Sequence, residues 1–177
     1  IFQDSIIITV DKHPDDDIED LTVNFIHLIS HFAIYSQFQQ LFYRGAISFG
    51  EYIQSDVGCY GPAINEAARN YECLRYFGII ATQSIVNISE KFNKDNLYLN
   101  WITKEKVKVK GTRKKTVQKY LYILNWHFAL PMIQPIPELD ISPNMTNTEA
   151  CKSIICKTKI QVENIPEVEH YQNTIEF

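Results

Sequence analysis

Apolar residues recur every three to four positions between residues 17 and 40. This spacing is typical of one face of an α-helix, and its members are Leu21, Phe25, Leu28, Ile29, Phe32 and Tyr35. A run of aspartates, DDD at 15–17, precedes the stripe. Negative charge is favourable there because the helix macrodipole is positive at the N-terminus. We predict a long helix over about 17–40.

The segment before this helix follows a different pattern. "FQDSIIITV" places a polar turn before an apolar, β-branched run. It therefore predicts the second arm of a hairpin that begins near Ser5, with Asp4 at the tip.

Elements alternate in type after the long helix. We predict a strand in "LFYRGAISFGEYI", a helix in "GPAINEAARNYE", a short strand in "GIIAT" and a helix over 83–92. Strands that alternate with helices in this way predict an α/β protein, and more narrowly an α+β sandwich in which helices pack on a sheet.

Beyond about residue 97 the pattern changes. "KVKVKGTRKKTVQKYLYILNW" alternates Lys and Val in its first arm and predicts a hairpin that turns near Gly111. The proline-rich "LPMIQPIPELDISPN" is not expected to form regular structure. Residues 147–177 are predicted to form two helices separated near 164–166. We interpret 1–177 as a single domain, with a core over 1–92 that 93–177 completes.

Composition narrows the class of protein. A chain of 177 residues with 45% hydrophobic residues can bury the core of one domain. No apolar run approaches the roughly 20 residues that cross a bilayer, and no signal-like segment opens the chain, so we expect a cytoplasmic protein without a membrane partner. The four cysteines lack metal-type spacing and are expected to be reduced.

Charge bears on the choice of partner. The formal net charge is −4, which argues against a broad nucleic-acid footprint, so no nucleic-acid partner is expected. The basic run at 107–115 is interpreted as a solvated hairpin. His27 and His31 lie one helical turn apart, a spacing that can bind zinc, but no third ligand is nearby and we interpret them as polar-face residues.

Asn65 and Arg69 carry the first chemical hypothesis. They lie one turn apart in the predicted helix of "GPAINEAARNYE", so the amide and the guanidinium can reach the same anionic group. Such a pair suits the charge that develops on a phosphoryl group during transfer. The spacing alone is a weak signal, and by itself it is more typical of an ordinary surface pair.

The longer stretch "YRGAISFGEYIQSDVGCYGPAINEAARNYE" resembles the core of the class III nucleotide cyclases. The resemblance implies a ferredoxin-like sheet with helices packed on it, with Asn65 orienting the substrate ribose and Arg69 stabilising the phosphates in the transition state. "FQDS" resembles the hairpin tip that carries a metal-binding aspartate, which makes Asp4 a metal ligand, although Gln3 replaces the usual glycine or serine. The family's other metal-binding aspartate would precede Ile1, so we expect the sequence to begin inside the domain.

Cofactors and partners follow from the same resemblance. A cyclase joins a ribose 3′-hydroxyl to the α-phosphate of a nucleoside triphosphate and expels pyrophosphate, with two Mg²⁺ or Mn²⁺ ions. The family builds composite active sites across a head-to-tail pair of subunits, so a homodimer is implied. Arg44 and Tyr60 are candidate substrate-binding residues.

The nucleobase of the substrate is less well defined by the sequence. One base-reading position of the purine cyclases would precede Ile1, and the other is Gly58, which has no side chain to read a purine. The tip, the "RGAIS" strand, "GPAINEA" and the closing "YQNTIEF" resemble the pyrimidine cyclases of Pycsar anti-phage systems, which make cyclic CMP or cyclic UMP from CTP or UTP.

Three alternatives remain open at this point. The protein could be a purine (adenylate or guanylate) cyclase, or a catalytically silent cyclase-like domain that binds nucleotide and dimerises. It could also be an interaction module that uses the basic hairpin at 107–115.

Overall fold

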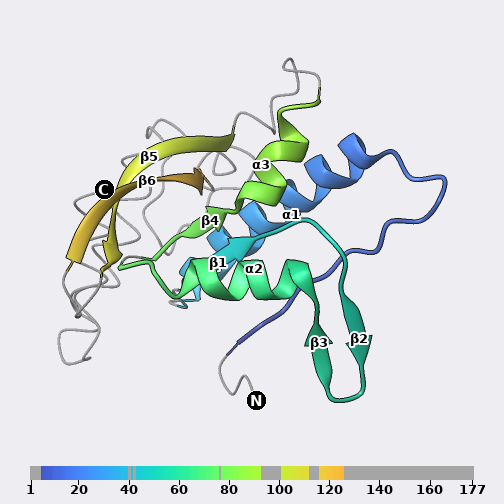
Figure 1. Ribbon diagram of the computed structural model, residues 1–177, viewed down its shortest axis with the longest axis horizontal. Helices are drawn as coiled ribbons and strands as arrows, with labels where there is room; N and C mark the ends of the chain where they lie inside the picture. Colours follow the sequence, from blue (N-terminus) through green and yellow to red (C-terminus); the bar gives the residue numbers. More distant parts are fainter. Residues whose placement is uncertain are drawn as a thin grey trace.

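The computed structural model describes residues 5–39, 41, 43–75, 77–92, 101–111 and 116–125. Within these residues the chain forms three helices and six strands (Figure 1). In chain order they are α1 (Ile18–Phe38), β1 (Gly45–Ile47), β2 (Ile53–Ser55), β3 (Gly58–Tyr60), α2 (Pro62–Tyr71), β4 (Ile79–Ala81), α3 (Gln83–Ser89), β5 (Ile102–Lys110) and β6 (Thr116–Leu124).

The predicted long helix is confirmed as α1. Asp17 caps its first turn, because its Oδ1 accepts hydrogen bonds from the backbone N–H groups of Glu19 at 2.7 Å and Asp20 at 3.3 Å. The buried side of the helix differs from the predicted stripe. Leu28 and Tyr35 are half exposed, at 50% and 52%, whereas the fully buried positions of α1 include Ile26, Ser30 and Ile34.

Four strands form a mixed sheet in the order β1-β4-β6-β5. β1 and β4 are parallel, as expected for strands joined through a helix, while β6 is antiparallel to both β4 and β5. The β5–β6 hairpin pairs nine residues from each strand. β2 and β3 form a separate two-stranded hairpin that projects from the body of the molecule (Figure 1).

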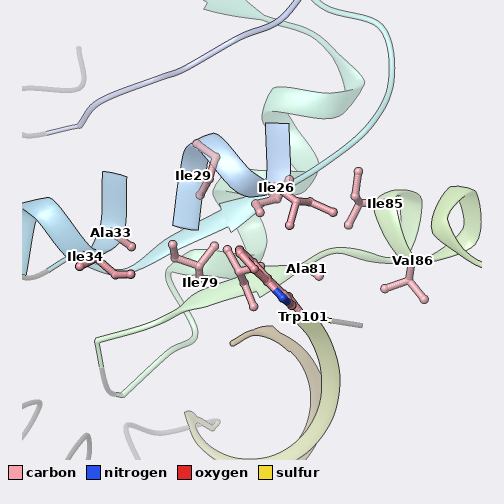
Figure 2. Packing of buried hydrophobic residues seen from close by; sticks show 11 residues of the cluster. Ile26, Ile29, Ala33, Ile34, Ile79, Ala81, Ile85, Val86 and Trp101 are labelled. Carbon is pink, nitrogen blue, oxygen red and sulfur yellow. The ribbon is translucent and has the colours of Figure 1, made fainter. Parts of the chain in front are cut away.

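Apolar clusters lie on both faces of the sheet. One brings together α1, α3, the strands and Trp101, and Figure 2 shows the α1 side chains across from Ile79 and Trp101. The other consists of Leu74, Ile80, Val107, Val109 and Ile123. Leu74 follows α2 and bridges to Val109, and the backbone N–H of Lys110 donates to the Cys73 carbonyl at 2.7 Å. The hairpin is therefore held to the chain segment that leaves α2.

The architecture agrees with the predicted α+β class at the level of a mixed sheet with helices packed on it. The short strand β4, the helix α3 within 83–92 and the long hairpin around Gly111 all confirm the pattern-based predictions. The predictions for 126–177 fall outside the described residues.

The strand predicted from Ser5 is wrong. Residues 5–10 do not form a strand in the structure. A strand needs a neighbour to accept its ladder of hydrogen bonds, and none of the described strands pairs with this segment. Its contact with the core is made by Ile8, which packs against the cluster beneath α1.

None of the three described helices is long and apolar enough to cross a bilayer.

Candidate functional site

Helix α2 begins at a turn that only glycine fits. Gly61 has φ 143° and ψ 178°, a conformation that L-residues rarely adopt. A Cβ added to Gly61 would lie 2.8 Å from both the Glu51 carbonyl oxygen and the Tyr52 Cα. Pro62 then takes the first helical position, where its missing N–H costs nothing. Gly61 and Pro62 thus fix where the predicted site helix starts.

Polar contacts fix the direction of α2. The Ser48 hydroxyl, just after β1, donates to the Ala63 carbonyl at 2.7 Å. Glu66 is not among the site residues predicted from the sequence, although it lies inside the string "INEAAR". Its Oε1 accepts from the backbone N–H of Ser84 in the first turn of α3 at 3.2 Å, and Ser84 Oγ accepts from the Phe49 N–H at 2.8 Å. Glu66 therefore ties α2 to α3 and, through Ser84, to the end of β1.

The two sides of α2 have different surroundings. Ala63, Ala67 and Tyr71 line an open cavity of about 1020 Å³. Asn65 and Arg69 are exposed and do not line it. The helix period therefore places both predicted catalytic residues together, on an open side of α2.

The cavity lies on the other side of the helix. Its walls come from residues 5–12, one side of α1, residues 43–52 and α2, and most of the lining side chains are apolar. Because neither Asn65 nor Arg69 contributes to it, this cavity and the predicted site do not coincide.

The remaining predicted residues are dispersed. Arg44 directly precedes β1, is half-buried, lines the cavity and donates from Nη1 to the Leu74 carbonyl at 3.2 Å. It is therefore not brought to the side of α2 that carries Asn65. Tyr60 ends β3, is 52% exposed and directly precedes Gly61. Asp4 lies outside the described residues.

The local environment raises the pKa of three groups near the cavity and the hairpins. The Tyr52 hydroxyl donates to Asp11 Oδ1 at 2.5 Å, and this bond raises the pKa of Tyr52. Burial raises the pKa of Tyr43, whose ring stacks on Phe32 at a centroid distance of 5.4 Å. Burial also raises the pKa of the Cys73 thiol, so this cysteine is held in the unreactive form.

A metal site is not formed by the described residues alone. Among them no group of three or more His, Cys, Asp or Glu side chains is arranged to hold a metal ion. The His27 and His31 rings meet edge to face at 4.1 Å, and His27 also lies edge to face with Trp101 at 5.9 Å. Burial, with the neighbouring His31, lowers the pKa of His27. These contacts fit a structural role for the two histidines.

Comparison with protein-family models, with curated proteins and with solved structures finds no match for this chain. The sequence resemblance and the geometry of α2 are therefore the observations that bear on the function of this chain.

Proposed function

We propose that the protein is a class III, metal-dependent nucleotidyl cyclase that converts CTP or UTP to the 3′,5′-cyclic monophosphate and pyrophosphate, a second messenger in anti-phage defence. The observation that carries the proposal is the position of Asn65 and Arg69, one turn apart on an open side of α2. Their helix starts at the Gly61–Pro62 turn, in the order along the chain that the resemblance requires.

The two side chains suit different parts of the substrate. The Asn65 amide offers both a donor and an acceptor, which can hold a ribose hydroxyl and its ring oxygen. The Arg69 guanidinium presents a planar fork that can bind two phosphate oxygens at once. In the reaction the 3′-oxygen bonds to the α-phosphorus as the bond to pyrophosphate breaks, and Arg69 would stabilise the charge that builds up on the phosphate oxygens.

The metal ions are proposed from the resemblance to the class III cyclases. Two Mg²⁺ or Mn²⁺ ions, with Asp4 as one ligand, are proposed on that ground alone, because the described residues contain no set of metal ligands. Among the described residues, Asn65 and Arg69 are the ones proposed to act on the substrate.

A homodimer is part of the same proposal. An exposed pair on one helix cannot enclose a nucleotide, so a second surface must complete the site. The neighbouring β2–β3 hairpin exposes apolar side chains that a partner could cover, with Val57 95% exposed, Ile53 56% and Tyr60 52%. These residues support a composite site in which Asn65 and Arg69 face the aspartates of the other subunit.

The proposal is tested by assaying the full-length protein with Mn²⁺ and each of ATP, GTP, CTP and UTP, with products identified by mass spectrometry. Cyclic CMP or cyclic UMP is expected. Asn65→Ala and Arg69→Ala should each reduce turnover by about 100-fold or more, the usual effect of removing one group that stabilises transition-state charge. Arg69→Lys should recover only part of the loss because lysine lacks the fork.

The matched control is Asn87→Ala, which removes the same amide from an exposed position of α3. It should leave turnover unchanged. Cyclic AMP or cyclic GMP would instead identify a purine cyclase, and the absence of any cyclic product would favour the silent nucleotide-binding domain. Full activity in Asn65→Ala or Arg69→Ala would remove that residue from the site.

A further inference from the structure

The register of the β5–β6 hairpin sorts its side chains onto two faces. Residues directly opposite each other in an antiparallel pair share a face, and the faces alternate along each strand. One set of cross-strand pairs is Lys104–Tyr122, Lys106–Tyr120, Lys108–Gln118 and Lys110–Thr116. We name the surface formed by these eight residues the lysine face.

The opposite face explains why the lysine face points outward. Val107, Val109 and Ile123 are buried on the opposite face, in the cluster around Leu74. The next cross-strand pair on the same side of the hairpin, Ile102–Leu124, is covered because it packs into the cluster beneath α1. Figure 1 shows the rest of the hairpin extending away from the helices. Lys104, Lys106 and Lys110 are accordingly exposed.

The charge of the lysine face is of one sign. Alternate residues of a strand lie about 7 Å apart, so its four lysines form a row on the order of 20 Å long. None of the eight residues is acidic, and Glu105 belongs to the opposite face. The formal net charge of the whole chain, −4, does not reveal that these positive charges lie together on one face. A row of positive charge on one face complements a polyanion.

Aromatic rings lie within the same row. Tyr120 is 65% exposed, directly opposite Lys106. The Nζ of Lys104 lies 5.6 Å from the centroid of the Tyr122 ring, which is half-buried. A large exposed tyrosine on an open strand surface can stack on a base. A duplex offers no unstacked base to such a ring, so the combination of lysines with Tyr120 favours a single strand.

We propose that the lysine face binds single-stranded RNA or DNA, with the lysines along the phosphates and a base stacked on Tyr120. The inference goes beyond the proposed cyclase reaction and does not depend on it. It also departs from the expectation, based on net charge, that the protein has no nucleic-acid partner.

The test is fluorescence anisotropy with a labelled 20-nucleotide single-stranded RNA of mixed sequence, titrated with the full-length protein at several salt concentrations and without nucleoside triphosphate. Binding should weaken with salt. The triple variant Lys104→Gln, Lys106→Gln, Lys110→Gln should lower the slope of log affinity against log salt by about 2, since each phosphate contact to a single strand contributes roughly 0.7. Tyr120→Leu should weaken binding by about ten-fold without changing the slope.

Lys119→Gln is the matched control for a single charge, compared with Lys106→Gln. Both lysines are exposed on the same hairpin, but Lys119 pairs with Val107 and lies on the opposite face. Lys119→Gln should leave affinity unchanged. Circular dichroism of every variant should match the wild type because the changed side chains are exposed.

Several outcomes would overturn the proposal. One is no binding at about 50 mM salt, and another is an equal effect of Lys106→Gln and Lys119→Gln. Equal affinity for a 20-base-pair duplex, or for inorganic polyphosphate with Tyr120→Leu silent, would show a general polyanion surface in place of a single-strand site. Because the readout is RNA binding, its failure carries no information about cyclase turnover.

Discussion

The described part of the chain contains two hairpins that are stabilised in opposite ways. The β5–β6 hairpin has nine residues in each strand, and one face of it is buried against Leu74, Ile80 and the chain after α2. The β2–β3 hairpin has three residues in each strand, and five of these six residues are exposed. A two-stranded hairpin of this size is marginal in water by itself. It is held at its base by the close backbone contact at Gly61 and by the Tyr52–Asp11 hydrogen bond.

The difference indicates how each hairpin should respond to mutation. Side-chain burial dominates in the long hairpin, whereas backbone fit at the base dominates in the short one. If this comparison is correct, the same chemical change should have very different costs in the two places.

The largest contrast is expected for isoleucine. Ile123→Ala, at a position 3% exposed in β6, should lower the free energy of unfolding by about 2–5 kcal/mol through lost burial and a cavity. Ile53→Ala, 56% exposed in β2, should cost about 0.5 kcal/mol or less. Urea unfolding followed by circular dichroism measures both, and similar costs would contradict the comparison.

In the short hairpin, by contrast, a large loss of stability is expected from a glycine substitution at its base. Gly58 and Gly61 have nearly the same φ, 141° and 143°. Alanine at either position costs about 1–3 kcal/mol in backbone strain. At Gly61 the new Cβ also meets the Glu51 carbonyl, whereas at Gly58 nothing lies within 4 Å. Gly61→Ala should therefore unfold at lower urea than Gly58→Ala, and equal midpoints would show that the close contact is relieved without cost.

The base of the long hairpin should confer a pH dependence. His27 lies against Trp101, which leads into β5, and burial lowers its pKa below the ordinary value of 6.5. The unfolded chain then binds this proton more tightly, so stability falls as the pH drops below about 6.5 and levels off under the folded-state pKa. His27→Gln should reduce the difference between the Tm values at pH 8 and pH 5.5. An unchanged difference would exclude this contribution.

A small effect is expected at the base of the short hairpin. Tyr52→Phe removes the hydrogen bond to Asp11 and should cost no more than about 1 kcal/mol because both residues are at the surface. Locally, the segment 5–12 should loosen, which trypsin cleavage after Lys12 would report. Tyr60→Phe, on β3, is the matched control and should leave that cleavage rate unchanged.

Periodicity predicted the elements better than their orientation. The position of α1 followed from its apolar spacing, but Leu28 and Tyr35 belong to the predicted stripe and are half exposed. A helix with apolar residues on several sides can rotate, and its contacts with the sheet decide which side is buried. The strand predicted over 5–10 failed for a related reason, because strand formation depends on a neighbour that a local pattern cannot identify.

In the candidate site, too, some features follow from the local sequence and others depend on how the elements pack. Asn65 and Arg69 share a side of α2 because the helix repeat requires it, so the sequence was sufficient. The contact of Arg44 with the Leu74 carbonyl joins residues 30 positions apart, and the link from Glu66 to Ser84 joins two helices. Such contacts depend on how the elements pack, and no short stretch of sequence encodes them.

The strand order has a consequence for the behaviour of the protein at high concentration. In the described sheet β5 is an edge strand that could recruit a strand from another molecule, except at its end, where residues 73–75 already bond to Lys108 and Lys110. Lysine at every second position places a row of like charges along that edge, so a second copy approaching it would be repelled. The alternation of lysine and valine in "KVKVK" would then protect the protein against aggregation, in the same strand that contributes Val107 and Val109 to the cluster around Leu74.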